Sequence, residues 1–426
     1  MILTLRQLQE KSAEQRQPLI VTFVDFSKAF DTVDRDTLCK LLSRCGCPQI
    51  FIRVLRSFHD GITASICCGD GCSDPFSVGN GVKQGCVLAP TLFTVFLAAV
   101  LKSMPEEHGD LYKRTRRDGY LFNLRRLKAK NKTQELLIQE LLFADDSALV
   151  THSLQAMQDL LTAFAEASKR FGLTIDMKKI EVLIQETHNK KLNCRVVLLN
   201  GTPLAEVDRF TFLGTTISNN GTIDAEISRR IQSAASAFGK LRSRLCDQRG
   251  IHLKTKVKVY RAIVIPTLLY RAETWTLYRC HIKRLDMVQQ RHLRQLMDIS
   301  WKDHVFNFQV PERAGMPSVE EMITPCQLRG IGHVTHMENS RLPKAVFYGK
   351  LKEGSRKVRA PRLRSKDAYK RHLKNIDELE NWREKGRRSR DLADGGGWRC
   401  RCHQKKKCTV VGGQENAQAG ENTYIC

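Results

Sequence analysis

The stretch Leu141-Leu142-Phe143-Ala144-Asp145-Asp146-Ser147-Ala148-Leu149-Val150 places two adjacent carboxylates between two short apolar runs. Apolar runs of this length are typical of strands, and the acids between them predict the turn of a β-hairpin. Side chains at such a turn project from the sheet edge, so Asp145 and Asp146 are expected to point together into a cleft. Two like charges this close repel, and a divalent metal ion would neutralise them. An ordinary polar turn is the alternative interpretation.

A second stretch carries a third acid. Leu19-Ile20-Val21-Thr22-Phe23-Val24 is an apolar, β-branched run that ends at Asp25. A carboxylate at the end of a buried strand can ligate a metal ion beside the hairpin turn. Three acids on one sheet suit two-metal phosphoryl transfer, in which one ion activates a hydroxyl and the other stabilises the leaving oxygen.

Five segments, in this order and spacing, resemble the palm motifs of non-LTR (LINE-type) retrotransposon reverse transcriptases. The resemblance runs from the N-terminus to about residue 345 and rests on FVDFSKAFD at 23–31, GVKQGCVLAP at 81–90, FADD at 143–146, FGLTIDMKK at 171–179 and FTFLG at 210–214.

The resemblance implies an RNA-directed DNA polymerase that uses an RNA template, a DNA primer and deoxynucleoside triphosphates. It implies that Asp25 and Asp145 bind both metal ions and that Asp146 completes the site. Mg²⁺ is the expected ion, because carboxylates and phosphates suit a hard cation, with Mn²⁺ as its substitute. The implied roles of the other residues are sugar selection by Phe30, base-pair positioning by Gln84 and Gly85, a general acid at Lys179, and a primer grip at Phe212, Leu213 and Gly214.

The expected fold is α+β. It comprises a right-hand polymerase palm, an antiparallel sheet with packed helices, over residues 1–218 with residual fingers. A helical thumb or connection follows at 219–345, and a basic, partly disordered arm at 346–426. Asp34 and Ser153 are expected to cap two of the palm helices. The start of the sequence leaves no room for the family's fingers strands, so slow or absent synthesis is expected of this chain alone.

Several of these positions have simpler interpretations. Phe30 could pack in the core, as most Phe side chains do. Residues 81–90 could be a plain loop, whereas the functional interpretation needs Gly85 to allow close backbone approach. The family has Gly where this chain has Arg271 and Trp where it has Gly330, and a strained turn is expected at Arg271.

Composition indicates the partners. The 426 residues carry a net charge of +25 and 42% hydrophobic residues, which predicts a globular protein that binds a polyanion, with nucleic acid first and an anionic membrane surface second. No apolar run is long enough to span a membrane, and no secretory signal is evident. The 15 scattered cysteines predict reduced thiols and a nuclear or cytoplasmic location.

Three basic regions are candidate nucleic-acid contacts. Residues 111–135 mix Arg and Lys with aromatic residues, although a solvated charged face would look the same. The segment after 341 is also basic, and its Cys400, Cys402, His403 and Cys408 lack the usual zinc spacing, so no zinc is expected. The third region is the set of thumb cations expected on polar helix faces: Arg229, Arg230, Lys240, Arg242, Arg244, Lys254, Lys256 and Lys258.

Two other functions share some of these features. A catalytically silent retrotransposon remnant would keep the charge and bind nucleic acid without synthesis. Another palm enzyme, such as a nucleotidyl cyclase, would share the paired acids but not the Lys83-Gln84-Gly85 turn. Primer extension on RNA and DNA templates separates these alternatives from a polymerase.

Overall fold

The structure is a computed structural model that describes residues 1–68, 71–105, 109–116, 133–186, 196–248, 250–354 and 363–374. The chain divides into two compact units, Met1–His372 and Leu373–Cys426. Every element described below belongs to the first unit, apart from the last two residues of helix α12.

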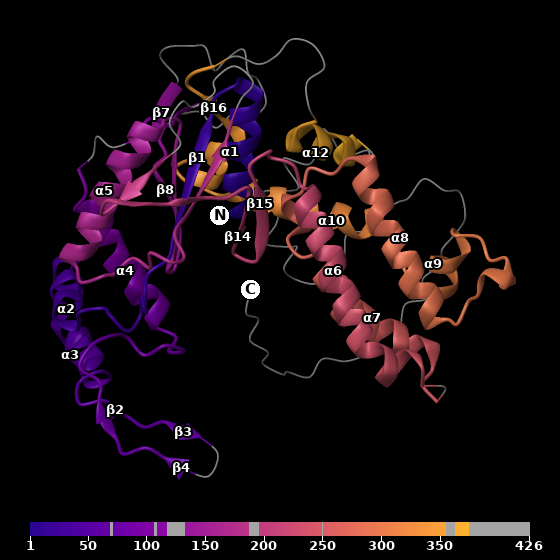
Figure 1. The fold of residues 1–426 in the computed structure, drawn as a ribbon, viewed down its shortest axis with the longest axis horizontal. Helices are drawn as coiled ribbons and strands as arrows, with labels where there is room; N and C mark the ends of the chain where they lie inside the picture. The colour runs from indigo at the N-terminus through magenta and orange to yellow at the C-terminus, as the bar shows by residue number, and fades with distance from the viewer. Residues whose placement is uncertain are drawn as a thin grey trace. The chain divides into compact units, whose positions relative to one another are not determined.

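A five-stranded sheet in the order β13-β10-β1-β9-β8 forms the centre of the palm (Figure 1). All neighbouring pairs are antiparallel except β10 and β13, which pair in parallel over two positions. The bounds are β1 Leu19–Val24, β8 Glu140–Phe143, β9 Asp146–Thr151, β10 Glu181–Gln185 and β13 Ala205–Glu206.

Side chains of β1 alternate between two hydrophobic cores. Ile20 and Val24 belong to the core formed with helices α2, α4 and α5, whereas Val21 and Phe23 belong to the core that contains Leu5 of helix α1. Both faces of the sheet are therefore covered, which explains why β1 is a continuous apolar run. This burial fixes the register and with it the position of the acids at the strand ends.

Helices of the palm begin where the sequence places caps. The Asp34 carboxylate accepts a hydrogen bond from the Thr37 backbone N–H at 2.6 Å, and the Ser153 hydroxyl accepts one from Ala156 at 3.2 Å. Both expected caps are confirmed. The bounds are α1 Ile2–Gln15, α2 Arg35–Arg44, α3 Gln49–Ser57, α4 Ala89–Lys102 and α5 Leu154–Arg170.

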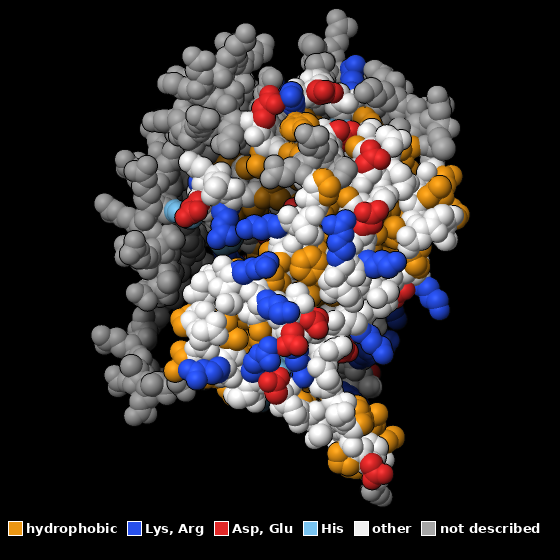
Figure 2. Space-filling model, turned by 90° about the vertical axis from the view of Figure 1, so that its left-hand side faces the viewer, with side chains coloured by type: hydrophobic (Ala, Val, Ile, Leu, Met, Phe, Trp, Pro, Cys, Tyr) orange, Lys and Arg blue, Asp and Glu red, His pale blue; other side chains and the backbone are white. Residues whose placement is uncertain are grey.

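An exposed double hairpin follows α3. Strands β2 (Thr63–Ala64) and β5 (Phe76–Ser77) pair, and beyond them β3 (Cys67–Cys68) pairs with β4 (Gly71–Cys72). Cys67 and Cys72 form a disulfide across that outer pair. The expectation of reduced thiols is wrong at these two positions, because strand pairing places their side chains opposite each other. Figure 2 shows hydrophobic side chains at this lower tip, where Ile66 and Phe76 are exposed.

Smaller strands complete the palm and its margins. Strands β14 and β15 form a hairpin next to the sheet, and β6 pairs with β7. The bounds are β6 Tyr112–Arg116, β7 Thr133–Leu137, β11 Leu198–Leu199, β12 Thr202–Pro203, β14 Arg209–Phe212 and β15 Thr215–Ser218.

Residues 219–345, for which the sequence predicts a helical thumb and which are called the thumb below, are helical over most of their length. A separate core of Ile227, Tyr260, Leu268, Trp275 and Leu285 holds these helices together. The bounds are α6 Asp224–Leu241, η3 Arg242–Cys246, α7 Leu253–Leu268, η4 Ala272–Thr274, α8 Arg279–Leu296, η5 Trp301–Asp303, α9 Gln309–Ala314 and α10 Val319–His336.

After the thumb the chain returns to the palm. Helix α11 (Leu342–Tyr348) leads to β16 (Lys350–Leu351), which pairs with β6, and α12 spans Ser365–Lys374. Val346 and Leu351 are fully buried in the core that also contains Leu5. The arm boundary expected at residue 346 therefore needs correction: apolar side chains tie this segment to the palm, and the division between units falls after His372. Among the helices in the described ranges, none combines the length and apolar character of a membrane span.

Candidate active site

Strand pairing brings the acid-bearing segments together. Val24 at the end of β1 lies opposite Ser147 of β9, so the next position along each strand holds Asp25 and Asp146. Phe143 pairs with Asp146, which makes Ala144 and Asp145 the two-residue loop of the β8–β9 hairpin. Asp145 thus lies in the turn as expected, whereas Asp146 is the first residue of β9. Opposed positions on antiparallel strands are about 5 Å apart at Cα, so the backbones of the acids are neighbours.

Lys179 approaches the same sheet end. Its ammonium group lies 2.7 Å from Asp25 Oδ2 and 3.8 Å from Asp176 Oδ2. The segment that carries it is fixed to the end of β1, because the Asp176 backbone N–H donates to the Asp25 carbonyl at 2.9 Å and Ile175 forms a bridge with Phe26. Ile180 is buried in the palm core. The structure therefore places the lysine beside the acids with which the sequence associates it.

Burial and neighbouring acids affect the protonation of Asp146. Desolvation raises the pKa of the Asp146 carboxyl above its usual value, and repulsion from Asp145 and Asp25 raises it further, against the opposing effect of Lys179. Ion pairing with Asp25 raises the pKa of the Lys179 ammonium group. A carboxylate cluster of this kind favours a bound cation.

Within the described ranges, no three His, Cys, Asp or Glu side chains are close enough together to hold one metal ion. The structure thus brings the backbones of Asp25, Asp145 and Asp146 together but does not converge their three carboxylates. Asp25 Oδ2 is instead paired with the Lys179 ammonium group, and carboxylates without a cation between them repel. The donor chemistry itself, all carboxylate oxygens, fits a hard divalent cation.

Phe30 contacts helix α4 through its side chain and the 81–85 turn through its backbone. Its ring packs on Phe93 with centroids 4.9 Å apart, and it is partly buried against the palm core. Its carbonyl accepts a hydrogen bond from the Val82 N–H at 2.8 Å, which attaches the turn to the segment after β1. Gln84 and Gly85 are exposed. In the part of the chain that the structure describes, nothing lies within 4 Å of a Cβ added at Gly85, so the turn is open at this position.

Arg35 is a positioning residue that the sequence analysis missed. Its guanidinium donates to the backbone carbonyls of His59 at 2.5 Å, Val78 at 3.0 Å, Asn80 at 3.1 Å and Gly81 at 2.8 Å. These bonds fix the segment after β5 that leads into the 81–85 turn. Arg35 directly follows the capping Asp34, where a charged residue is common in the first turn of a helix. The sequence therefore contains no signal for this role.

The predicted primer grip is the turn of the β14–β15 hairpin. Phe212 pairs with Thr215, which leaves Leu213 and Gly214 as a two-residue loop. Phe23 stacks on Phe210 with centroids 3.7 Å apart, so the hairpin packs on the strand that ends at Asp25. The structure therefore anchors the predicted grip to the acid-bearing strand through aromatic contact.

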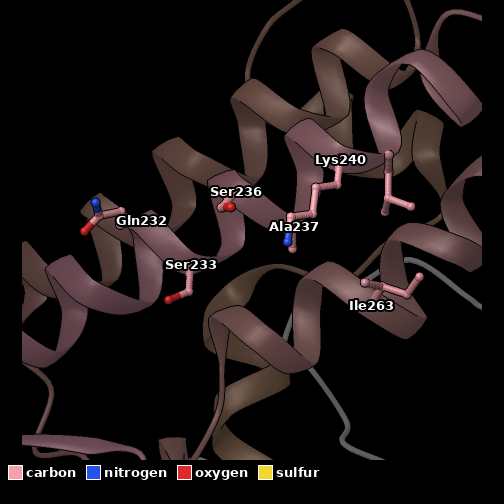
Figure 3. A pocket seen from close by; sticks show the side chains of 7 residues that line it. Gln232, Ser233, Ser236, Ala237, Lys240 and Ile263 are labelled. Carbon is pink, nitrogen blue, oxygen red and sulfur yellow. The ribbon is translucent and has the colours of Figure 1, made fainter. Parts of the chain in front are cut away.

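A groove between α6 and α7 lies on the thumb and has a volume of about 550 Å³ (Figure 3). Hydroxyl, amide and ammonium groups from α6 line it beside the apolar Ile263 of α7; the α6 residues are Gln232, Ser233, Ser236, Ala237, Lys240 and Leu241. Two of the cations expected on polar thumb faces are instead buried, Arg230 and Lys256. For Arg230 the reason is an ion pair with the fully buried Glu226.

Two other predicted sites lie mostly or wholly outside the residues that the structure describes. Most of the basic stretch at 111–135 and the Cys400–Cys408 cluster fall outside the described residues. On the face shown in Figure 2, Lys and Arg side chains outnumber acidic ones across the middle of the molecule. The positive charge expected from composition is thus visible on the described surface.

Comparison with known proteins gives a consistent result. Residues 2–217 match the family described as reverse transcriptase (RNA-dependent DNA polymerase). The chain is 26% identical over 287 residues to the RNA-directed DNA polymerase from mobile element jockey of Drosophila funebris, covering 66% of this chain and 28% of that protein. It is 21% identical over 327 residues to the Pol polyprotein of the type-2 retrotransposable element R2DM of Drosophila melanogaster, covering 73% of this chain and 28% of that protein.

Among solved structures, telomerase from Candida tropicalis aligns with 82% of this chain and 51% of its own, at 12% identity and a TM-score of 0.33. That similarity is too low to support an argument. The family match spans half of the chain and contains Asp25, Phe30, Gln84, Asp145, Asp146 and Lys179. The chain belongs to the reverse transcriptase (RNA-dependent DNA polymerase) family, and its relatives are polymerases of non-LTR retrotransposons.

Proposed function

We propose that this chain extends a DNA primer on an RNA template by nucleotidyl transfer from deoxynucleoside triphosphates. The observation that supports this most directly is the end of β1, where Asp25 lies beside the Asp145–Asp146 hairpin and contacts Lys179. The chain spans about 28% of the length of the two relatives above, so further activities of those longer proteins are not assigned to it.

Asp25, Asp145 and Asp146 would hold Mg²⁺, with Mn²⁺ as its substitute. When bound, two such ions activate the primer 3′-hydroxyl and stabilise the leaving oxygen. In this structure Asp25 Oδ2 accepts the Lys179 ammonium group, so that oxygen would have to be shared with or released from the lysine for Asp25 to serve as a ligand. Desolvation and the neighbouring acids raise the pKa of Asp146, and a bound cation would offset that repulsion.

The remaining side chains bind and orient the substrate. Lys179 is protonated, since its ion pair with Asp25 raises its pKa, and we assign it as the general acid toward the leaving pyrophosphate. Phe30 contacts the sugar and disfavours a 2′-hydroxyl. Gln84, exposed on a turn fixed through Val82 and Arg35, positions the base pair.

Nucleic acid binds along the thumb. The α6–α7 groove offers hydroxyl and amide donors and the exposed ammonium of Lys240, which suit a phosphate backbone. Residues 1–218 act as the palm and 219–345 as the thumb in this proposal, with Phe212, Leu213 and Gly214 at their junction holding the primer terminus.

Primer extension tests the proposal. The wild-type chain should extend a DNA primer on an RNA template with Mg²⁺, and Asp145→Asn should abolish synthesis while keeping duplex affinity within about twofold. Asp159→Asn on the exposed surface of α5 is the matched control. Duplex binding by the wild type without any synthesis would instead favour a nucleic-acid-binding remnant, and loss of both would reject both functions.

A further inference from the structure

The loop between β14 and β15 has an unfavourable backbone. Leu213 has φ 48° and Gly214 has φ 70°, so both loop residues are in the left-handed region. Two-residue hairpin loops of this kind favour Asn or Gly at both positions. A leucine at the first position is strained and persists only where surrounding contacts hold it.

Helix α6 supplies part of that support. The fully buried Glu226 carboxylate accepts a hydrogen bond from the Thr216 backbone N–H at 2.6 Å. Its other oxygen receives Arg230 Nε at 2.6 Å. Arg230 in turn donates to the Gly214 carbonyl. One buried ion pair therefore bonds the main chain of the loop and of the strand that follows it.

Two other segments hold the same loop. The Tyr270 hydroxyl, just after α7, donates to the Leu213 carbonyl at 3.5 Å, and its ring lies 3.6 Å from a Cβ added at Gly214. The Arg230 guanidinium lies 4.5 Å from the centre of the Tyr270 ring, a cation–π contact. From α1, Arg6 donates to the Thr216 carbonyl at 3.3 Å.

We propose that Glu226, Arg230 and Tyr270 are positioning residues for the primer terminus, a set we call the turn clamp. They hold the Leu213 and Gly214 carbonyls at fixed places, so that the loop forms a rigid support for the terminal primer nucleotide. This inference rests on the proposed function. It assigns a role to three residues whose hydrogen bonds go to the hairpin and to one another, away from the acids at Asp25 and Asp145.

The contacts argue for positioning as well as cohesion. A set of residues that only joined palm to thumb could use apolar packing, as the thumb core does. The turn clamp instead directs a buried charge pair at the loop main chain, and such bonds are directional. Orientation of this kind governs rate, because a displacement of about 1 Å at a reacting group can cost about 10²-fold.

The test compares Arg230→Met, Tyr270→Phe and the control Arg284→Met. Arg284 lies on α8 and binds Ser228 and Asp224 of α6. Its replacement therefore removes arginine contacts with α6 and leaves the contacts with the loop intact. Single-turnover extension gives a rate constant and an amplitude. Arg230→Met should lower the rate constant about 10- to 100-fold with duplex affinity within about twofold. Tyr270→Phe should lower it less, and Arg284→Met should leave it unchanged.

A fall in amplitude at an unchanged rate constant would mean fewer folded molecules and would overturn the positioning role. Tyr270→Phe removes one oxygen and keeps the ring, so it decides the matter if Arg230→Met fails to fold. An unchanged rate constant in Tyr270→Phe and in any folded Arg230→Met would also overturn the proposal.

Hydrogen exchange gives a readout that needs no synthesis. Backbone amides of residues 211–216 should exchange faster in Arg230→Met, or in Tyr270→Phe, than in the wild type and in Arg284→Met. Equal exchange in all variants would overturn the clamp itself. If the wild type extends no primer, the proposed polymerase function fails, and the exchange rates alone support or overturn the clamp.

Discussion

Lys179 and Asp25 form an ion pair of 2.7 Å at the end of the first palm strand. The Asp25 oxygen that faces this ammonium is also one that a divalent ion would need, so we expect the ion pair to weaken when such an ion binds. We propose that the lysine competes with the ion for Asp25 at rest and acts as a general acid during the reaction. These two roles have opposite effects on measurable quantities.

We expect Lys179→Met to lower the single-turnover rate about 10²- to 10⁴-fold, the usual contribution of a general acid. The Mg²⁺ concentration for half-maximal rate should fall in the same variant, because the competing ammonium is gone. Lys178→Met, with its neighbouring exposed side chain, is the control. A lower rate combined with a lower Mg²⁺ concentration for half-maximal rate fits only this dual role. An unchanged rate would contradict it.

Phe30→Val tests sugar selection. The Phe30 ring packs on Phe93 at 4.9 Å, and a smaller side chain leaves space where the ring now lies. Ribonucleotide incorporation should rise relative to deoxynucleotide incorporation, by about 10-fold or more, because one steric contact commonly contributes about 1–3 kcal/mol to discrimination. Competing incorporation of the two nucleotide types measures the ratio. The same ratio in variant and wild type would show that Phe30 has only a structural role.

Arg271 occupies a backbone conformation that favours glycine. Its φ of 59° confirms the strain expected from the replacement of the family's Gly. Arg271→Gly should stabilise the fold by about 1 kcal/mol. Removal of the guanidinium itself has little effect on stability, because its ion pair with Glu273 at 3.6 Å is exposed. Urea unfolding measures the difference.

The control for that change is Arg271→Ala, which removes the same guanidinium and keeps the strain. We expect Arg271→Ala to be neutral or slightly destabilising. If both variants unfold at the same urea concentration, the positive φ costs nothing and the strain argument fails.

His292 predicts a pH dependence of the thumb. Burial, with a smaller effect of Arg291, lowers its pKa to about 4, while its ring stacks on Phe238 at 4.2 Å. The unfolded imidazole titrates near 6.5. The folded state therefore keeps the ring neutral. Its contribution to the free energy of unfolding is fully present above about pH 6.5. It is lost as pH falls from about 6.5 towards 4, at about 1.4 kcal/mol per pH unit.

Urea unfolding at pH 7.5, 6.0 and 5.0 measures the effect. His292→Phe keeps an aromatic ring against Phe238 and cannot be protonated, so its stability should depend less on pH. Burial also lowers the pKa of His372, which leaves a residual slope. Identical slopes in the variant and the wild type would exclude His292 as the source.

The basic tail should dominate the salt dependence of nucleic-acid binding. Deletion of residues 375–426 removes many Lys and Arg side chains and leaves every described element in place. The slope of log affinity against log salt should flatten by about 0.9 for each lost phosphate contact. An unchanged slope would show that the tail makes no such contact. Deletion from residue 346 is unsuitable, because it also removes Val346 and Leu351 from the core.

The sequence predicts much of the palm because its signals there are local. The apolar run that ends at Asp25, the acids in a hairpin turn and the caps at Asp34 and Ser153 each depend on neighbouring residues, and each is found. Strand pairing then carries the acids to one sheet end. The ion pair of Asp25 with Lys179, 154 residues away in the chain, is a contact that no local pattern encodes.

The contacts that the sequence does not predict join distant segments. Glu226 and Arg230 are four residues apart on α6 and look like an ordinary surface pair, yet both are buried beneath the β14–β15 loop. Cys67 and Cys72 look like two scattered cysteines until strands β3 and β4 pair. Val346 and Leu351 lie in a region of high charge, where composition conceals their burial.

The return of β16 to β6 sets an order for folding during synthesis. Lys11 of the first helix is buried and donates to the carbonyls of Phe347 and Gly349, while the Glu10 carboxylate accepts from the Ser365 N–H at 2.9 Å. A ribosome that has released only the palm and thumb has not yet supplied these partners. Helix α1 waits for the segment around residue 365 before the polar groups of Glu10 and Lys11 have these partners, so completion of the palm is delayed until nearly the whole first unit has been translated.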